Sequence, residues 1–76
     1  MSKARNLNRL AYFAAVVETG SFTQAADRLG VTKAVVSAQV TQLEQELKTT
    51  LLVRNTRKVS ATEAGIAFYT RCAAIL

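Results

Sequence analysis

The chain has 76 residues, 50% of them hydrophobic and 20% charged, which is the composition of one small globular domain with a marginal core. Ten lysines and arginines against five aspartates and glutamates give a net charge of +5, which suits a polyanionic partner such as nucleic acid or an acidic membrane surface. The sequence has no histidine, one cysteine and no glycine-rich phosphate-binding motif. We therefore expect no enzymatic activity, no metal site and no cofactor.

The basic residues are concentrated at the two ends of the chain. Residues 1–9 carry +3, residues 10–47 carry −2 and residues 48–76 carry +4, which together give the total of +5. Basic surface residues are often only solvated, so this distribution favours a nucleic-acid partner without establishing one.

The sequence indicates neither a signal peptide nor a membrane span. The apolar run of residues 10–17 is too short to cross a bilayer, and Glu18 follows it directly. The single thiol, Cys72, fits a reducing compartment and is expected to be a buried small hydrophobe rather than a redox sensor. We therefore expect a cytoplasmic protein.

The first predicted helix covers residues 6–19. Gly20 follows it, at a point where a left-handed residue can end a helix. Apolar residues recur in this segment with helical spacing, at Leu7, Leu10, Phe13 or Ala14, and Val17.

A helix-turn-helix is predicted next. Ser21 starts a capping-box pattern for a second helix at residues 22–29, and Gly30 can end that helix. Thr32 is a good N-cap for a third helix at residues 33–47. Two helices joined by a three-residue turn that contains glycine are typical of this motif.

The rest of the chain is predicted to form a small hairpin and a fourth helix. Residues 51–53 and 59–61 are short extended segments on either side of a basic tip at residues 54–58, which is typical of a wing. Thr62 can cap a last helix at residues 63–76.

The third helix is predicted to have two different faces. At about 100° per residue, its large apolar residues fall on one side, at Val36, Val40, Leu43 and Leu47. The other side carries short or polar residues, namely Ala34, Ala38, Thr41 and Gln45, flanked by Lys33 and Ser37. Short side chains let a helix enter a DNA major groove about 12 Å wide.

These outer residues have suitable chemistry for DNA. Lys33 can donate to guanine O6 or N7, Ser37 can bond a base edge or a phosphate, and the methyl groups of Ala34, Ala38 and Thr41 can contact thymine methyls. The alternative is that the lysine contacts only phosphate and that the alanines serve only helix propensity.

The predicted wing supplies further candidate contacts. Arg57 at its tip can enter a narrow minor groove, whereas Arg54 and Lys58 are expected to hold phosphates. Thr32 is another candidate, although capping alone would explain it.

The last helix has an apolar face too broad for one small core. Two interpretations remain open. In one, the whole face packs on the first helix, and in the other, part of the face pairs with a second subunit. The candidate dimerisation residues are Phe68, Tyr69, Cys72, Ile75 and Leu76.

Five ordered motifs resemble the amino-terminal domain of the LysR-type transcriptional regulators. They are Phe13-x-x-Val16, Gly20-Ser21-Phe22-x-x-Ala25-Ala26-x-x-Leu29, Val36-Ser37-x-Gln39-Val40-x-x-Leu43-Glu44, Leu51-Leu52-x-Arg54-x-x-Arg57 and Thr62-x-x-Gly65. The resemblance covers about residues 7–76. It implies that the third helix is the recognition helix, with Lys33, Ala34, Ser37 and Ala38 at base-contacting positions, and that Arg57 is the minor-groove arginine.

The chain departs from the family pattern at six positions. Members often carry Gln-Pro at Lys33-Ala34 and Arg at Ala38, which puts the recognised DNA sequence in doubt. Other common family residues are Gly at Lys48, Phe at Leu52 and Leu at Ala61.

The resemblance implies an all-α winged helix-turn-helix with a three-helix core, a small β-hairpin wing and a C-terminal linker helix. Residues 1–62 would be the DNA-binding domain and residues 63–76 the start of the dimerisation helix. By family analogy the chain forms a homodimer, and the full-length protein a tetramer, on double-stranded DNA, while the effector binds a domain that this segment lacks. The alternatives are a helical protein-interaction module with an incidental basic face and a non-specific nucleoid or transposase-type binder.

Overall fold

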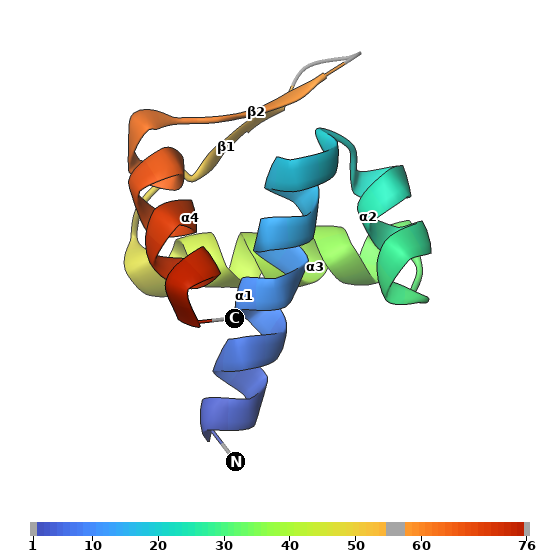
Figure 1. The fold of residues 1–76 in the computed structure, drawn as a ribbon, viewed down its shortest axis with the longest axis horizontal. Helices are drawn as coiled ribbons and strands as arrows, with labels where there is room; N and C mark the ends of the chain where they lie inside the picture. The colour runs from blue at the N-terminus through green and yellow to red at the C-terminus, as the bar shows by residue number, and fades with distance from the viewer. Residues whose placement is uncertain (1, 55–57, 76) are drawn as a thin grey trace.

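The computed structural model describes the backbone of residues 2–54 and 58–75 and the side chains of residues 9–54 and 58–74. In this part of the chain, four helices and a two-stranded hairpin follow one another in the order α1–α2–α3–β1–β2–α4 (Figure 1). None of the helices described is both long and apolar enough to cross a membrane.

The three-helix core consists of α1 (Ser2–Thr19), α2 (Phe22–Leu29) and α3 (Lys33–Leu47). Helix α3 runs behind α1, with α2 on one side and α4 (Glu63–Ile75) on the other, and α1 contacts all three (Figure 1). Each helix predicted from the sequence is present. The first begins at Ser2 instead of residue 6, because residues 2–5 continue the helix without the apolar spacing on which the prediction rested.

Three side-chain caps start the later helices, as predicted. In each, a hydroxyl oxygen accepts a hydrogen bond from the backbone N–H three residues further on: Ser21 from Gln24 at 3.2 Å, Thr32 from Val35 at 3.2 Å, and Thr62 from Gly65 at 3.0 Å. These bonds satisfy donors that a helix leaves without a partner in its first turn.

The turn between α2 and α3 is fixed by Gly30, which has φ 69°. The N–H of Gly30 donates to the Asp27 carbonyl at 3.3 Å, and the N–H of Val31 donates to the Ala26 carbonyl at 3.0 Å. These two bonds form a Schellman-type helix end, which sets the angle at which the chain enters α3.

The hairpin pairs β1 (Leu52–Arg54) with β2 (Val59–Ala61) in antiparallel register, with Leu52 opposite Ala61 and Arg54 opposite Val59. It extends along one side of the helical core (Figure 1). The predicted wing is therefore present.

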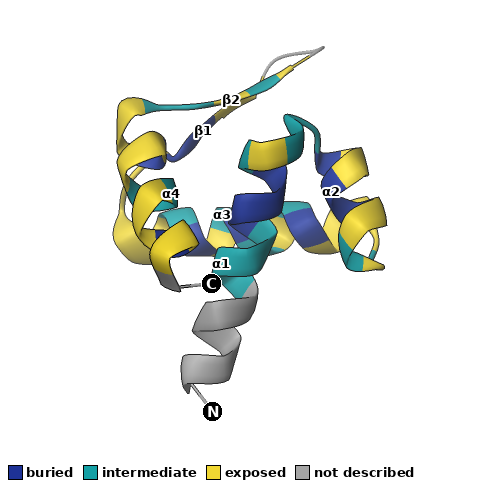
Figure 2. Ribbon diagram, in the orientation of Figure 1, coloured by how far each residue is buried: buried dark blue, intermediate teal, exposed yellow. Residues whose placement is uncertain are grey.

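The core lies where the inner faces of the helices meet the start of the hairpin (Figure 2). Its largest fully buried side chains are Phe13, Val16, Val36, Val40, Leu51 and Cys72. The prediction that Leu47 belongs to the buried face of α3 is wrong, because this residue is 42% exposed. It is the last residue of α3, and it lines an open depression with Ala64 and Phe68 of α4 instead of entering the core.

Helix α3 ends at Lys48, which adopts a left-handed conformation with φ 52° and donates its N–H to the Gln45 carbonyl at 3.2 Å. Residues other than glycine adopt this backbone conformation at an energetic cost. The position is therefore one where a glycine would fit better.

We predict that Lys48→Gly raises the free energy of unfolding by about 1 kcal/mol, because glycine removes the left-handed strain at the end of α3. Urea unfolding of the two proteins measures the difference. Lys48→Ala is the control, since it removes the lysine but keeps the strain. A glycine variant no more stable than the alanine variant would contradict the prediction.

Candidate nucleic-acid interface

The outer side of α3 presents short side chains to solvent. Four of the residues predicted to contact DNA are exposed there: Thr32, Lys33, Ala34 and Ala38. Ser37 and Thr41 are half-buried, because both are bonded by a side chain from the hairpin. We call these six residues the α3 ridge.

The ridge is held outward by the packing of the opposite face. Val36 and Val40 are fully buried, and Leu43 is buried one turn further on. Val35, which is not among the predicted contacts, is 37% exposed beside the ridge. Its position about 100° from Val36 on the helix is the signal that could have identified it.

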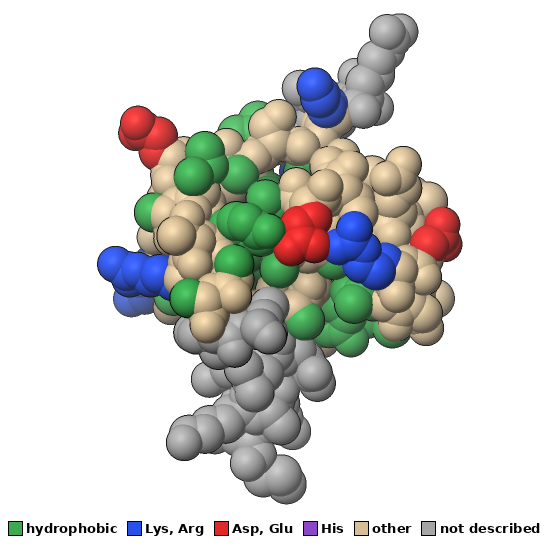
Figure 3. Space-filling model, viewed as in Figure 1, with side chains coloured by type: hydrophobic (Ala, Val, Ile, Leu, Met, Phe, Trp, Pro, Cys, Tyr) green, Lys and Arg blue, Asp and Glu red, His purple; other side chains and the backbone are tan. Residues whose placement is uncertain are grey.

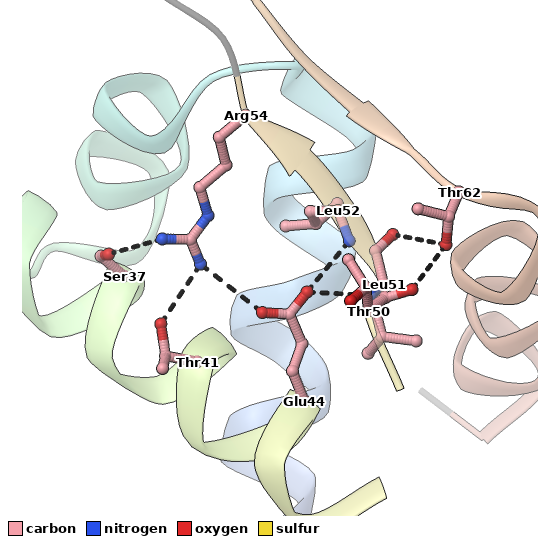
Figure 4. A network of polar contacts seen from close by, with 8 residues as sticks. All are labelled: Ser37, Thr41, Glu44, Thr50, Leu51, Leu52, Arg54 and Thr62. Atoms are coloured by element: carbon pink, nitrogen blue, oxygen red, sulfur yellow. Dashed lines mark hydrogen bonds and ion pairs between the residues drawn. The ribbon is translucent and has the colours of Figure 1, made fainter. Parts of the chain in front are cut away.

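Arg54, at the end of β1, turns toward α3 (Figure 4). Its Nη1 donates to the Ser37 hydroxyl at 3.4 Å, and its Nη2 donates to the Thr41 hydroxyl at 3.3 Å. The same Nη2 lies 3.8 Å from a carboxylate oxygen of Glu44. The arginine expected to hold a phosphate thus has three partners on the third helix within the chain itself.

Glu44 connects α3 to the base of the hairpin (Figure 4). Its Oε2 accepts hydrogen bonds from the backbone N–H groups of Leu51 at 2.8 Å and Leu52 at 3.1 Å. In the sequence, Glu44 belongs to a family motif that predicts no role for it. Nothing local in the sequence indicates these bonds, since the partners lie seven and eight residues away along the chain.

The basic tip of the wing is only partly described. Lys58, just before β2, is exposed, as a phosphate contact must be. Arg57, predicted for the minor groove, lies outside the described residues.

The predicted dimerisation residues of α4 differ in their surroundings. Phe68 is half-buried against Phe13, with ring centroids 5.6 Å apart, and Tyr69 is also half-buried. Cys72 is 1% exposed, so its side chain belongs to the core of its own chain, and burial raises the pKa of the thiol. The side chain of Ile75 and all of Leu76 lie outside the described residues.

The face shown in Figure 3 carries charged side chains of both signs, and hydrophobic side chains gather between α4 and α1. Three arginines of the described chain lie within ion-pair distance of carboxylates: Arg28 of Glu18, Arg9 of Glu46 and Arg54 of Glu44. Pairs of this kind offset part of the basic charge of the chain.

Tyr69 joins α4 to the end of α1. Its hydroxyl donates to a carboxylate oxygen of Glu18 at 2.8 Å. This bond, with a second from Arg28, lowers the pKa of Glu18 from its ordinary value, and the same carboxylate raises the pKa of Tyr69. The bond is therefore strongest when the glutamate is ionised and the tyrosine is protonated.

We predict that Tyr69→Phe destabilises the protein most in the middle of the pH range. A lowered Glu18 pKa contributes stability above about pH 4.5 that is lost as the pH falls through the folded value, and a raised Tyr69 pKa contributes stability below about pH 10 that is lost as the pH rises through it. Urea unfolding at several pH values gives the difference between wild type and variant. A difference constant from acid to alkaline pH would contradict the prediction.

One protein family matches most of the chain. The family described as "Bacterial regulatory helix-turn-helix protein, lysR family" matches residues 7–66. An uncharacterized HTH-type transcriptional regulator of Haemophilus influenzae is 50% identical over 70 residues, covering 92% of this chain and 24% of that protein. The nitrogen assimilation regulatory protein nac of Escherichia coli is 46% identical over 71 residues, covering 93% of this chain and 23% of that protein.

Solved structures with the same arrangement include complexes with DNA. The complex of the BenM DNA-binding domain with benA site 1 DNA superposes with a TM-score of 0.87 at 43% identity, covering 91% of this chain and 78% of that one. The CbnR DNA-binding domain complexed with DNA gives 0.88 at 38% identity, covering 91% and 79%. The chain spans about a quarter of the length of the curated relatives. The matching family consists of transcriptional regulators rather than enzymes, as the sequence predicted.

Proposed function

Because the chain belongs to the lysR family of bacterial regulatory helix-turn-helix proteins, we propose that it binds double-stranded DNA sequence-specifically to control transcription, with the α3 ridge in the major groove. The observation that carries the proposal is the exposure of Lys33, Ala34 and Ala38 above the buried face of α3. A helix with such short side chains approaches base edges closely. The DNA complexes of BenM and CbnR, which share the fold, support this proposal.

Each ridge residue has a specific role in this proposal. Lys33 donates to guanine O6 or N7, Ser37 bonds a base edge, and Ala34 and Ala38 contact thymine methyls. Thr32 accepts a backbone N–H bond as the N-cap, which leaves its hydroxyl hydrogen to donate to a phosphate oxygen.

The wing contacts the DNA beside the ridge. Arg57 enters the minor groove, where the negative potential attracts guanidinium groups, and Lys58 holds a phosphate. The methyl group of Thr41 completes the ridge on the side that faces the hairpin. Arg54, which the sequence predicts to hold a phosphate, has its guanidinium at the recognition helix, where it donates to the Ser37 hydroxyl.

For the assembly, we propose a homodimer in the cytoplasm, with residues 1–62 as the DNA-binding unit and residues 63–76 as the start of a linker helix. The partly exposed Phe68 and Tyr69, with Ile75 and Leu76, are the proposed contacts of α4 with a second copy. Two-fold symmetry would place half-sites about one helical turn apart. Sedimentation at micromolar concentration should give the mass of two chains, and a strict monomer would contradict the dimer.

Salt dependence of binding tests the proposed function. If a dimer neutralises about six phosphates, the logarithm of the association constant should fall with the logarithm of salt concentration with a slope of about −5. Affinity that is flat with salt, or absent at low salt, would favour the protein-interaction module. Salt-dependent binding without any preferred sequence would favour a non-specific binder.

We predict that Ser37→Ala changes the preference among DNA sequences, with a loss of about 1 to 3 kcal/mol on the preferred duplex and little loss elsewhere. Arg57→Ala should weaken binding to every sequence. Titration of preferred and scrambled duplexes measures both effects. Gln45→Ala, an exposed change late in the same helix, is the control. An equal loss on all duplexes from Ser37→Ala would refute its role in recognition.

A further inference from the structure

The guanidinium of Arg54 is surrounded by groups from two helices. On α3 its partners are the side chains of Ser37, Thr41 and Glu44, which follow one another at spacings of four and three residues and so lie on one side of the helix. On α2 its partner is the ring of Phe22, whose centroid lies 4.7 Å from the arginine Cζ. The arginine side chain is 38% exposed, so it is partly covered while still in reach of solvent.

Two of these contacts fix the guanidinium in place. The Phe22 ring is buried and offers its face to a cation, which is an attractive contact. The Glu44 carboxylate accepts hydrogen bonds from the backbone N–H groups of Leu51 and Leu52, which hold it beside α3 (Figure 4). Its charge therefore attracts the guanidinium toward the helix. Arg54 is therefore directed toward the helix rather than away from the protein.

The contacts with Ser37 and Thr41 determine what those hydroxyls can offer to DNA. A hydroxyl has one hydrogen to donate and two lone pairs to accept with, and Arg54 uses a lone pair on each. In the described part of the chain, the hydroxyls of Thr19 and Thr70 donate to carbonyls four residues earlier in their helices. No such bond is present for Ser37 or Thr41 in that part, so their hydrogens remain for an external acceptor.

We propose that Arg54 is a positioning residue that makes Ser37 and Thr41 hydrogen-bond donors toward DNA, so that the α3 ridge prefers base edges that present acceptors. In the major groove the acceptors are guanine O6 and N7, thymine O4 and adenine N7, and the donors are the amino groups of cytosine and adenine. A cation beside each hydroxyl also repels the partly positive amino hydrogens. This inference rests on the proposed function, because it requires the ridge to contact bases.

The competing role for Arg54 is a direct phosphate contact. A phosphate contact adds affinity on every sequence and contributes about one unit to the salt slope. A positioning residue changes the preference among bases and leaves the salt slope as it was. The two roles therefore differ in two independent measurements.

Arg54→Gln is the test, on the preferred duplex and on duplexes with a single changed base pair at each position. We expect the variant to lose about fivefold or more of the discrimination at the positions that Ser37→Ala also affects, with the wild-type salt slope. When Arg54→Gln is combined with Ser37→Ala, it should cause no further loss of discrimination at those positions, because there both changes act through the Ser37 hydroxyl. Arg71→Gln, which removes an exposed arginine of α4, is the control.

Uniform weakening on every duplex, with a salt slope smaller by about two units because the dimer carries two copies of Arg54, would overturn the proposal in favour of a phosphate contact. Unchanged discrimination among base pairs by Arg54→Gln would also overturn the proposal. If Arg54→Gln does not fold, as judged by circular dichroism, Arg54→Lys replaces it, since lysine keeps the charge but lacks the planar fork and should lose the same discrimination. A wild-type chain without any base preference would contradict both the proposed function and this inference, whereas a selective wild type with a silent Arg54 variant would contradict only the inference.

Discussion

Gly65→Ala is expected to lower the free energy of unfolding by about 3 kcal/mol, because the first turn of α4 has no room for a methyl group. A Cβ at this position would lie 2.1 Å from the carbonyl oxygen of Leu51 and 3.0 Å from the carbonyl carbon. The oxygen cannot move freely, since it accepts hydrogen bonds from the N–H of Thr62 at 3.0 Å and from its hydroxyl at 3.3 Å. Relief of the clash would break the junction between the hairpin and α4.

Urea unfolding followed by circular dichroism measures the effect, with Gly30→Ala as the matched control. Gly30 has a left-handed backbone, but nothing lies within 4 Å of a Cβ built there, so its alanine variant should lose only about 1 kcal/mol for conformation. If Gly65→Ala lost no more than Gly30→Ala, close packing at the start of α4 would not explain the glycine.

Glu44→Ala is expected to lower the free energy of unfolding by about 3 kcal/mol, because it leaves two backbone N–H groups at the base of the hairpin without their acceptor. Those groups belong to Leu51 and Leu52, whose side chains are buried in the core. The substitution also removes the carboxylate that faces Arg54. The wing should then loosen from α3.

Two further variants separate the causes. Glu44→Gln keeps a side-chain oxygen for one N–H bond and should lose less than the alanine variant. Glu46→Ala removes a carboxylate two residues away that forms only a half-exposed ion pair with Arg9, so it should lose less than about 1 kcal/mol. Equal losses from Glu44→Ala and Glu46→Ala in urea unfolding would show that the backbone bonds contribute little.

The features that were predictable from the sequence are those set by neighbouring residues. Ser21, Thr32 and Thr62 each bond a backbone group three residues away, and Gly30 ends a helix by its own conformation. Interactions of this range are visible as short motifs. The boundaries of α2 and α3 follow from them and agree with the prediction.

The features that were missed depend on distant contacts. Glu44 and Arg54 meet because the hairpin folds back along α3, and no local pattern fixes that approach. Gly65 was recognised as part of a motif, but its reason, the carbonyl of Leu51, lies fourteen residues earlier in the chain. Leu47 has the helical phase of a core residue, yet it is exposed because the core ends before the last turn of α3.

The central claim is that the α3 ridge lies in the major groove while the wing reaches the minor groove, and methylation interference with dimethyl sulfate tests both on one selected duplex. The reagent methylates guanine N7 in the major groove and adenine N3 in the minor groove. A methylated base is therefore depleted from the bound DNA wherever its methyl group would obstruct contact with the protein. The account predicts that methylated guanines within each half-site, and methylated adenines beside them, are depleted from the bound fraction. Binding that tolerates a methyl group at every guanine of the selected site would contradict it.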